Sequence, residues 1–253
     1  MAGPDKERLH LWTGSPYSDR IRPERQMDSD NYSKLGSAHH VVVLGHPAHG
    51  SFNHAIAERY CSTVRDCDQQ VTLRDLYELG FDPRLYADHR PNSRTNILSG
   101  DVTGEMGLLR NADAIVLVYP IWFGMPPAMI KGYVDRVLGH VLTPNDIADH
   151  VPDYFLKGRY FASFSTSATS LPWLNQQGQL AALEVTFDHY LLQIFGMIDA
   201  GHTHFAGIIE GLDTVKADET LVVVEAKARE TCKRIDAQRS AIRSRPLMGA
   251  DLE

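Results

Sequence analysis

The sequence predicts a doubly wound α/β fold, with a five-stranded parallel sheet in the order 2-1-3-4-5 and helices on both faces. Three observations predict it. The stretches 40–44 and 114–119 are unbroken apolar runs rich in Val, which is typical of strands that helices bury on both faces. Strand and helix patterns alternate along the chain at a spacing of about 30 to 45 residues. Short polar loops follow the strands, as parallel sheets with helical crossovers require.

Each predicted element has a local reason. Pro120 is expected to end its strand because it has no N–H for the ladder, and Pro126-Pro127 delay the next helix until Pro127. Helix patterns show apolar residues at a spacing of three or four. The predicted strands span 40–44, 71–77, 114–119, 159–165 and 196–206; the predicted helices begin at 52 and span 101–111, 127–138, 178–195 and 214–239.

The chain is predicted to hold one folded domain, residues 38–243. Residues 1–37 combine many charges with proline and glycine, so they bury little apolar surface and are expected to form a disordered extension. The alternative is an arm that packs on a partner subunit through Leu9, Leu11 and Trp12. Residues 244–253 are expected to fray.

Composition limits the function classes. A formal net charge of −7 argues against binding to nucleic acid, which needs clustered Lys and Arg. Three cysteines without a CxxC pattern predict reduced thiols and a cytoplasmic location. Neither an integral membrane segment nor a signal peptide is expected, since no apolar run is long enough.

Several familiar motifs are missing. There is no GxGxxG, no GxxxxGK[ST] and no GxSxG, which disfavours a dedicated dinucleotide fold, a P-loop and a nucleophile-elbow hydrolase. His202-Thr203-His204 lies on a predicted strand, so both imidazoles should share a face. With no third ligand evident, no metal site is predicted.

The predicted strand order brings together the loops after strands 1, 3 and 4. The first ends in Ser51 and Asn53 at a helix N-terminus, where a phosphate is favoured, although any such turn contains a capping residue. The second carries Trp122-Phe123, which suit a flat ring. The third, 165–170, is rich in hydroxyls, which is also common in ordinary turns. Together they predict a site for a phosphorylated aromatic heterocycle.

Three motifs resemble the flavodoxin-like NAD(P)H:quinone oxidoreductases. They are Gly45-His46-Pro47 with Ser51-Phe52-Asn53, Asp75-Leu76-Tyr77 with Phe81-Asp82-Pro83, and the run from Tyr119 to Ala128 followed by Ile130 to Val137. The likeness covers about 39 to 205. It implies a flavodoxin-like fold and a homodimeric flavoprotein that takes hydride from NAD(P)H and reduces a quinone-like acceptor, with FAD or FMN as the bound flavin.

The resemblance also implies site residues. It places His46, Ser51, Phe52 and Asn53 near the flavin phosphate, and Pro120, Ile121, Trp122 and Phe123 along the isoalloxazine. From the residues themselves, Ser165, Thr166 and Ser167 are expected to bond the polar edge of the ring. Tyr154 is the candidate catalytic residue.

Alternatives from other classes share the fold. A one-electron flavin carrier would show little turnover of NADH. A flavin-free regulatory subunit of a transporter would bind a partner through the long helix predicted at 178–195 and through the tail. That helix has a wide apolar stripe. The stripe indicates burial against the protein core in the first place, and its width also favours a dimer contact. For an oxidoreductase, one ring face serving both substrates in turn predicts ping-pong kinetics.

Overall fold

We describe a computed structural model of the chain, which covers residues 36–89, 98–140, 142 and 155–244. The predicted extension before residue 36, the tail beyond Ser244 and the candidate Tyr154 lie outside these described residues.

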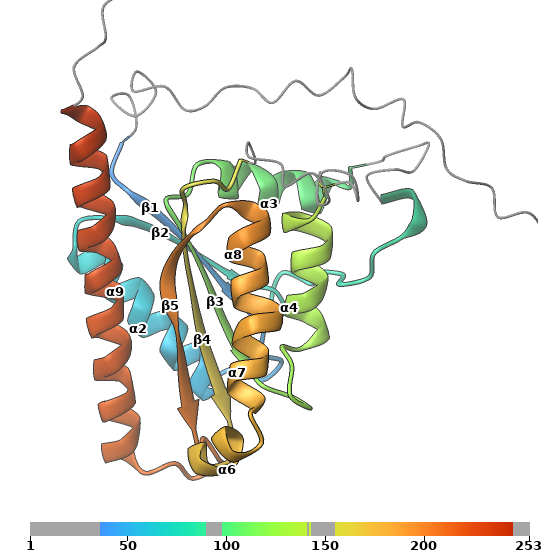
Figure 1. Ribbon diagram of the computed structural model, residues 1–253, viewed down its shortest axis with the longest axis vertical. Coiled ribbons are helices and arrows are strands. Elements are labelled where there is room, and N and C mark those ends of the chain that lie inside the picture. Colours follow the sequence, from blue (N-terminus) through green and yellow to red (C-terminus); the bar gives the residue numbers. More distant parts are fainter. Residues whose placement is uncertain (1–35, 90–97, 141, 143–154, 245–253) are drawn as a thin grey trace, which may run out of the picture.

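The centre of the molecule is a parallel five-stranded sheet in the order β2-β1-β3-β4-β5, so the predicted fold class is confirmed. All strand carboxyl ends therefore point the same way, toward the lower end of Figure 1. The strands are β1 (His39–Leu44), β2 (Gln70–Asp75), β3 (Ala114–Pro120), β4 (Tyr160–Ser167) and β5 (Ile198–Ala206).

Helices cover both faces of the sheet (Figure 1). Alternate residues of β1 and β3 point to opposite faces: Val41 and Leu117 pack against α3, α4 and the α7–α8 segment, while Val42 and Val116 pack against α2 and α9. These apolar strand residues are fully buried, as the unbroken apolar runs predict. The helices are α2 (Phe52–Asp66), α3 (Gly100–Arg110), α4 (Ala128–Tyr133), α6 (Leu171–Gln176), α7 (Gln179–Leu183), α8 (Tyr190–Phe195) and α9 (Thr214–Arg243).

Two strands run further than predicted. β4 continues through Ser167 because Ser165 pairs with Tyr119 on one side and His204 on the other, which satisfies the backbone of the hydroxyl-rich stretch. β3 includes Pro120, and the ladder persists because the next residue, Ile121, donates its N–H to the Thr166 carbonyl at 2.7 Å. The predicted ends at 165 and 119 were therefore too early.

Two other strands are shorter than predicted. β2 stops at Asp75 because its Oδ1 accepts the N–H groups of Tyr77 and Glu78 at 3.0 and 3.2 Å, which turns the chain. β5 begins at Ile198 rather than 196, since Gly196 has φ 63° and ends α8 in the left-handed conformation.

The helices agree with the predictions in place and differ in detail. The helix predicted at 127–138 is α4 followed by a π-helical segment, Val134–Leu138, and the one predicted at 178–195 is α7, a π-helical segment Glu184–His189, and α8. α9 runs to Arg243, beyond the predicted 239. Alternating sequence patterns do not reveal a change from α to π hydrogen bonding.

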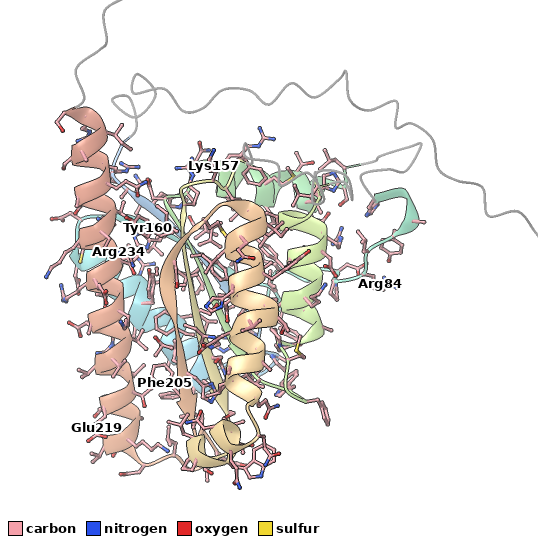
Figure 2. The ribbon with its side chains drawn as sticks, viewed as in Figure 1. Arg84, Lys157, Tyr160, Phe205, Glu219 and Arg234 are labelled. Carbon is pink, nitrogen blue, oxygen red and sulfur yellow. The ribbon has the colours of Figure 1, made fainter. Side chains whose placement is uncertain are left out.

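An ion pair fastens α9 to the amino end of the sheet. Arg239 donates from Nε and Nη2 to Asp113 at 2.9 and 2.7 Å, and from Nη1 to the Gly36 carbonyl at 2.7 Å. Both side chains are buried. Nearby, the Arg234 guanidinium lies over the Tyr160 ring at 4.9 Å (Figure 2). This end is opposite the strand carboxyl ends.

No helix in the described part of the chain is long and apolar enough to cross a membrane. All three cysteines are free, and Cys61 and Cys232 are buried.

His40 is a buried histidine whose titration should affect stability. Its Nε2 donates to Gln69 Oε1 at 2.8 Å, and its Nδ1 lies 3.0 Å from the Tyr60 hydroxyl. Burial lowers its pKa to about 4, outweighing the opposing effect of Gln69. The unfolded chain, with a pKa near 6.5, binds the proton first as the pH falls. The unfolding free energy that neutral His40 contributes above pH 6.5 is therefore lost as the pH falls from about 6.5 to 4.

Between pH 7 and pH 5, wild type should lose about 2 kcal/mol more unfolding free energy than the variant His40→Gln, which cannot titrate there. Urea unfolding at both pH values measures the difference. Equal pH dependence in the two proteins would contradict the assignment.

Candidate functional site

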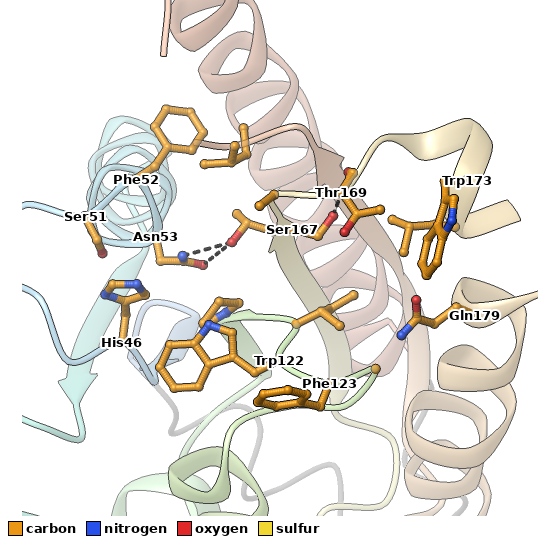
Figure 3. A pocket seen from close by; sticks show the side chains of 17 residues that line it. His46, Ser51, Phe52, Asn53, Trp122, Phe123, Ser167, Thr169, Trp173 and Gln179 are labelled. Carbon is orange, nitrogen blue, oxygen red and sulfur yellow. Dashed lines mark hydrogen bonds between the residues drawn. The ribbon is translucent and has the colours of Figure 1, made fainter. Parts of the chain in front are cut away.

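A cleft of about 410 Å³ lies at the carboxyl ends of β1, β3 and β4. This is the edge at which doubly wound sheets bind ligands. Every predicted cofactor residue except Ser165 lines it, so the structure brings the three loops together (Figure 3). The lining residues that were predicted are His46, Ser51, Phe52, Asn53, Pro120, Ile121, Trp122, Phe123, Thr166 and Ser167.

The first wall of the cleft is the N-terminus of α2. Ser51 is its N-cap residue, with extended backbone, but its side chain does not cap the helix. Instead, the Ser51 hydroxyl lies 2.8 Å from His54 Nδ1. The first N–H groups of a helix have no acceptor within the helix. The His54 N–H donates to the Ser51 carbonyl at 2.9 Å, but the N–H groups of Phe52 and Asn53, with the positive end of the helix dipole, suit an anion.

His46 stands between this helix and the aromatic turn. Its Nδ1 lies 3.1 Å from the Ala48 nitrogen and 3.3 Å from the Ala48 carbonyl oxygen, so it can accept the N–H or donate to the carbonyl, depending on the tautomer. Burial is the largest cause lowering the pKa of His46, and His54 adds to it, while the Ala48 contact and Asp75 oppose it. The ring lies 6.1 Å from that of Trp122, centroid to centroid. His46 therefore presents a ring whose Nε2 donates or accepts a hydrogen bond according to the tautomer.

The second wall is a tight turn, Trp122 to Met125. Trp122 and Met125 exchange backbone hydrogen bonds at 3.0 and 3.1 Å, and the two central residues, Phe123 and Gly124, have φ of 50° and 84°. Such a turn favours glycine at both central positions. Phe123 bears the strain of a left-handed backbone and projects fully into solvent at the cleft rim. The turn holds two aromatic rings at the mouth of the cleft.

The third wall is the end of β4. Asn53 Nδ2 donates to Thr166 Oγ1 at 3.0 Å, so the start of α2 is tied to β4 across the floor of the cleft (Figure 3). Both side chains are buried. Ser167, the last residue of β4, donates from its hydroxyl toward the Thr169 carbonyl at 3.1 Å. The two hydroxyls thus have partners already within the chain.

Ser165 does not line the cleft. It is fully buried inside β4, and its hydroxyl lies 2.6 Å from His202 Nε2 and 2.8 Å from His204 Nδ1. The prediction treated 165–167 as part of an exposed loop. Because the strand continues to Ser167, Ser165 lies two residues before its carboxyl end, on the same face as Ser167, and is buried beneath the cleft.

Residues after β4 complete the cleft and were missed by sequence reasoning. Trp173 and Leu174 come from α6, Gln179 begins α7, and Ile208 follows β5. α6 was not predicted. Its signal is Ser170 as N-cap residue followed by Leu171-Pro172, a proline in the first turn of a helix.

Histidines cluster near the cleft in two places. His54 Nε2 donates to Asp75 Oδ2 at 2.9 Å, and these atoms and one nitrogen of His49 lie within 4.8 Å of one another. Among the residues described, this is the only group of three His, Cys, Asp or Glu side chains whose ligand atoms lie this close together. The predicted pair His202 and His204 does share one face, as both rings contact Ser165.

The chain belongs to a family of proteins with a flavodoxin-like fold, whose model matches residues 38–230. The match covers the whole sheet and all three walls of the cleft.

Particular relatives extend this likeness. A Haemophilus influenzae protein named Uncharacterized NAD(P)H oxidoreductase is 39% identical over 102 residues, 40% of this chain and 50% of that protein. The chain thus spans about half the length of that relative. The mouse protein named Ribosyldihydronicotinamide dehydrogenase [quinone] is 23% identical over 213 residues, 75% of this chain and 88% of the relative.

A solved structure shares the fold. The NAD(P)H:quinone oxidoreductase from Methanothermobacter marburgensis superimposes with a TM-score of 0.64 and 20% identity, covering 77% of this chain and 97% of that chain.

Proposed function

We propose that this protein is a flavin-dependent NAD(P)H:quinone oxidoreductase, which transfers hydride from NAD(P)H through bound flavin to a quinone or a similar acceptor. The observation that carries the proposal is the cleft itself: a helix N-terminus without its side-chain cap, a turn with two aromatic rings and the end of β4 line one space. Relatives with oxidoreductase names support it.

The residues present fit a flavin. The N-terminus of α2, with Ser51 and Phe52, would hold a phosphate, since its first N–H groups have no acceptor within the helix. Ile121, Trp122 and Phe123 would lie along the flat ring, whose apolar faces suit them. His46 would add a ring nitrogen able to form a hydrogen bond between the two.

When bound, the flavin supplies the hydride chemistry, and the protein supplies position and electrostatics. Trp122 and Trp173, both about half exposed at the rim, would exclude water from the reacting face. The backbone N–H groups of Phe123 and Gly124, and those of the segment after β4, would stabilise negative charge on the ring.

NAD(P)H and the acceptor would use the same face of the ring in turn. Ping-pong kinetics would follow, with parallel lines in initial-rate plots when both substrates are varied. Intersecting lines would count against a shared face.

The proposal is tested by the visible spectrum of the purified protein and the mass of any released cofactor. We expect a yellow protein, with either FMN or FAD released on denaturation, that oxidises NADH or NADPH in the presence of a quinone. A colourless protein that neither FMN nor FAD reconstitutes would support the regulatory subunit. Bound flavin with little NAD(P)H turnover would support the electron carrier.

We also propose a homodimer. Val185 and Tyr190 of the α7–α8 segment are 60% and 48% exposed, and the aromatic rim of the cleft is exposed too. Large apolar side chains that are exposed together favour burial against another protein surface. Sedimentation at micromolar concentration tests this, and a monomer there would contradict it.

A further inference from the structure

Behind the cleft, a row of hydrogen-bonded side chains links helix and sheet. It begins at Asp188 in the π-helical segment Glu184–His189, crosses β4 and β5, and ends at the last residue of β4. The successive contacts are Asp188 Oδ2 to His202 Nδ1 at 2.7 Å, His202 Nε2 to Ser165 Oγ at 2.6 Å, Ser165 Oγ to His204 Nδ1 at 2.8 Å, and His204 Nε2 to Ser167 Oγ at 3.0 Å.

The two ends of the row reach different spaces. Ser167 lines the cleft proposed to hold flavin. Asp188 and His202 line a second cavity, of about 200 Å³, between the helix and β5. The middle member, Ser165, is fully buried. The row is therefore a polar path through the protein interior from one cavity to the other.

Every inner member of the row can both accept and donate a hydrogen. A neutral imidazole has one N–H and one bare nitrogen, and a hydroxyl donates once and accepts twice. Burial, with a smaller effect from His202, lowers the pKa of His204 to about 4, so this ring is neutral at pH 7. A neutral ring can take a proton on one nitrogen and release one from the other.

The end at Ser167 has two alternative partners. Its hydroxyl lies 3.0 Å from His204 Nε2 and 3.1 Å from the Thr169 carbonyl. When the hydroxyl donates to His204, every hydrogen in the row points toward Asp188. When it turns to Thr169 or into the cleft, His204 Nε2–H can donate to it, and the row points toward the cleft. The geometry thus permits both directions.

We propose that this row conducts the proton that quinone reduction takes from solvent, from Asp188 to the Ser167 hydroxyl. The inference rests on the proposed function. A hydride brings two electrons and one hydrogen, while a quinone needs two electrons and two protons to become a hydroquinone, so one proton must come from water in each turnover.

The transfer balances without further reactants. Once water in the second cavity has delivered a proton to Asp188, the carboxyl gives it to His202 Nδ1, and Nε2 releases one to Ser165. The Ser165 hydroxyl passes its hydrogen to His204 Nδ1, whose Nε2 protonates Ser167 as its hydroxyl hydrogen moves to the acceptor oxygen. Asp188 is left as a carboxylate, which water in the second cavity protonates again. Hydroxyl rotation and tautomer exchange restore the row.

Two variants interrupt the path with uncharged side chains that can still form hydrogen bonds. In Asp188→Asn the amide oxygen still accepts from His202 but holds no proton, and in His204→Gln the two ring nitrogens are lost. We expect flavin reduction by NAD(P)H to stay unchanged and the acceptor step to slow about 10²-fold. The ratio of that rate in H₂O and D₂O should rise. An unchanged acceptor step in both variants would overturn the proposal and leave the proposed function intact.

Matched controls separate proton transfer from packing. Ser163 donates to Asp188 Oδ1 at 2.6 Å on a side branch, so Ser163→Ala should lower the melting temperature without slowing the acceptor step. His40→Gln removes another buried histidine, which contacts Tyr60 of α2 and lines neither cavity. If these two variants slow the acceptor step as much as Asp188→Asn does, the row has only a structural role.

A readout without substrates makes the test independent of the activity. In ¹⁵N spectra of the protein as purified, the ring nitrogens of His204 should shift with the titration of the Asp188 carboxyl, and Asp188→Asn should abolish that response. A His204 signal indifferent to Asp188 would overturn the proposal even if the enzyme reduces quinones. If His204 responds to Asp188 but the protein does not reduce quinones with NAD(P)H, the proposed function alone is refuted. The other titratable groups near Asp188, whose signals must be assigned separately, are Tyr119 from β3, Glu184 and His189 from its own segment, and Asp199 and His202 from β5.

Discussion

Replacing Ser51 by aspartate is expected to weaken the binding of FMN and FAD about 10²-fold while leaving riboflavin binding almost unchanged. Ser51 is the N-cap residue of α2 at the cleft, where we propose that the flavin phosphate lies. A carboxylate there would face the phosphate across about 4 Å, a repulsion of about 3 to 4 kcal/mol at the edge of a protein. Riboflavin has the same ring and no phosphate.

The substitution should not harm the fold, because aspartate is as good an N-cap residue as serine and its charge favours the helix N-terminus. Fluorescence titration of the flavin-free protein with the three flavins measures the effect, and a melting curve checks the fold. Ser62→Asp adds the same charge to an exposed position of α2 away from its N-terminus, so it is the control. Equal losses for riboflavin and FMN would show that the phosphate is bound elsewhere.

Replacing Arg239 by methionine is expected to lower the unfolding free energy by about 3 to 5 kcal/mol. The change leaves the Asp113 carboxylate buried, and among the residues that the structure describes only the His39 N–H, at 2.8 Å, still donates to it. The cost arises mainly from that uncompensated charge. Urea unfolding at pH 7 measures it.

Two comparisons sharpen this prediction. The double variant Asp113→Asn, Arg239→Met should be more stable than the single Arg239→Met, because it removes the stranded charge. Lys227→Met breaks an exposed pair with Glu230 on the same helix and should cost under about 1 kcal/mol. Flavin affinity should not change in any of these, since the pair lies at the opposite end of the sheet. A loss below about 1 kcal/mol for Arg239→Met would contradict the argument.

The sheet and its order could be predicted because they depend on local patterns. The fully buried strands are visible in the sequence as apolar runs. Their alternation with helices is compatible with only a few topologies of the sheet. The ends of the strands were harder to predict, because they depend on hydrogen-bond partners that are distant in the chain. Ser165 is in a strand because His204 and Tyr119 lie beside it, and a run of hydroxyls carries no sign of that.

The sequence by itself determined the fold class and the three loops that form the cleft, since strand order fixes which carboxyl ends are neighbours. Only the tertiary structure decided which face each side chain takes and which groups then meet. It turned Ser165 inward between two histidines and brought α6 to the cleft rim. A hydrogen-bonded row from Asp188 to Ser167 is assembled from three separate segments, and contacts of that kind leave no periodic trace in the chain.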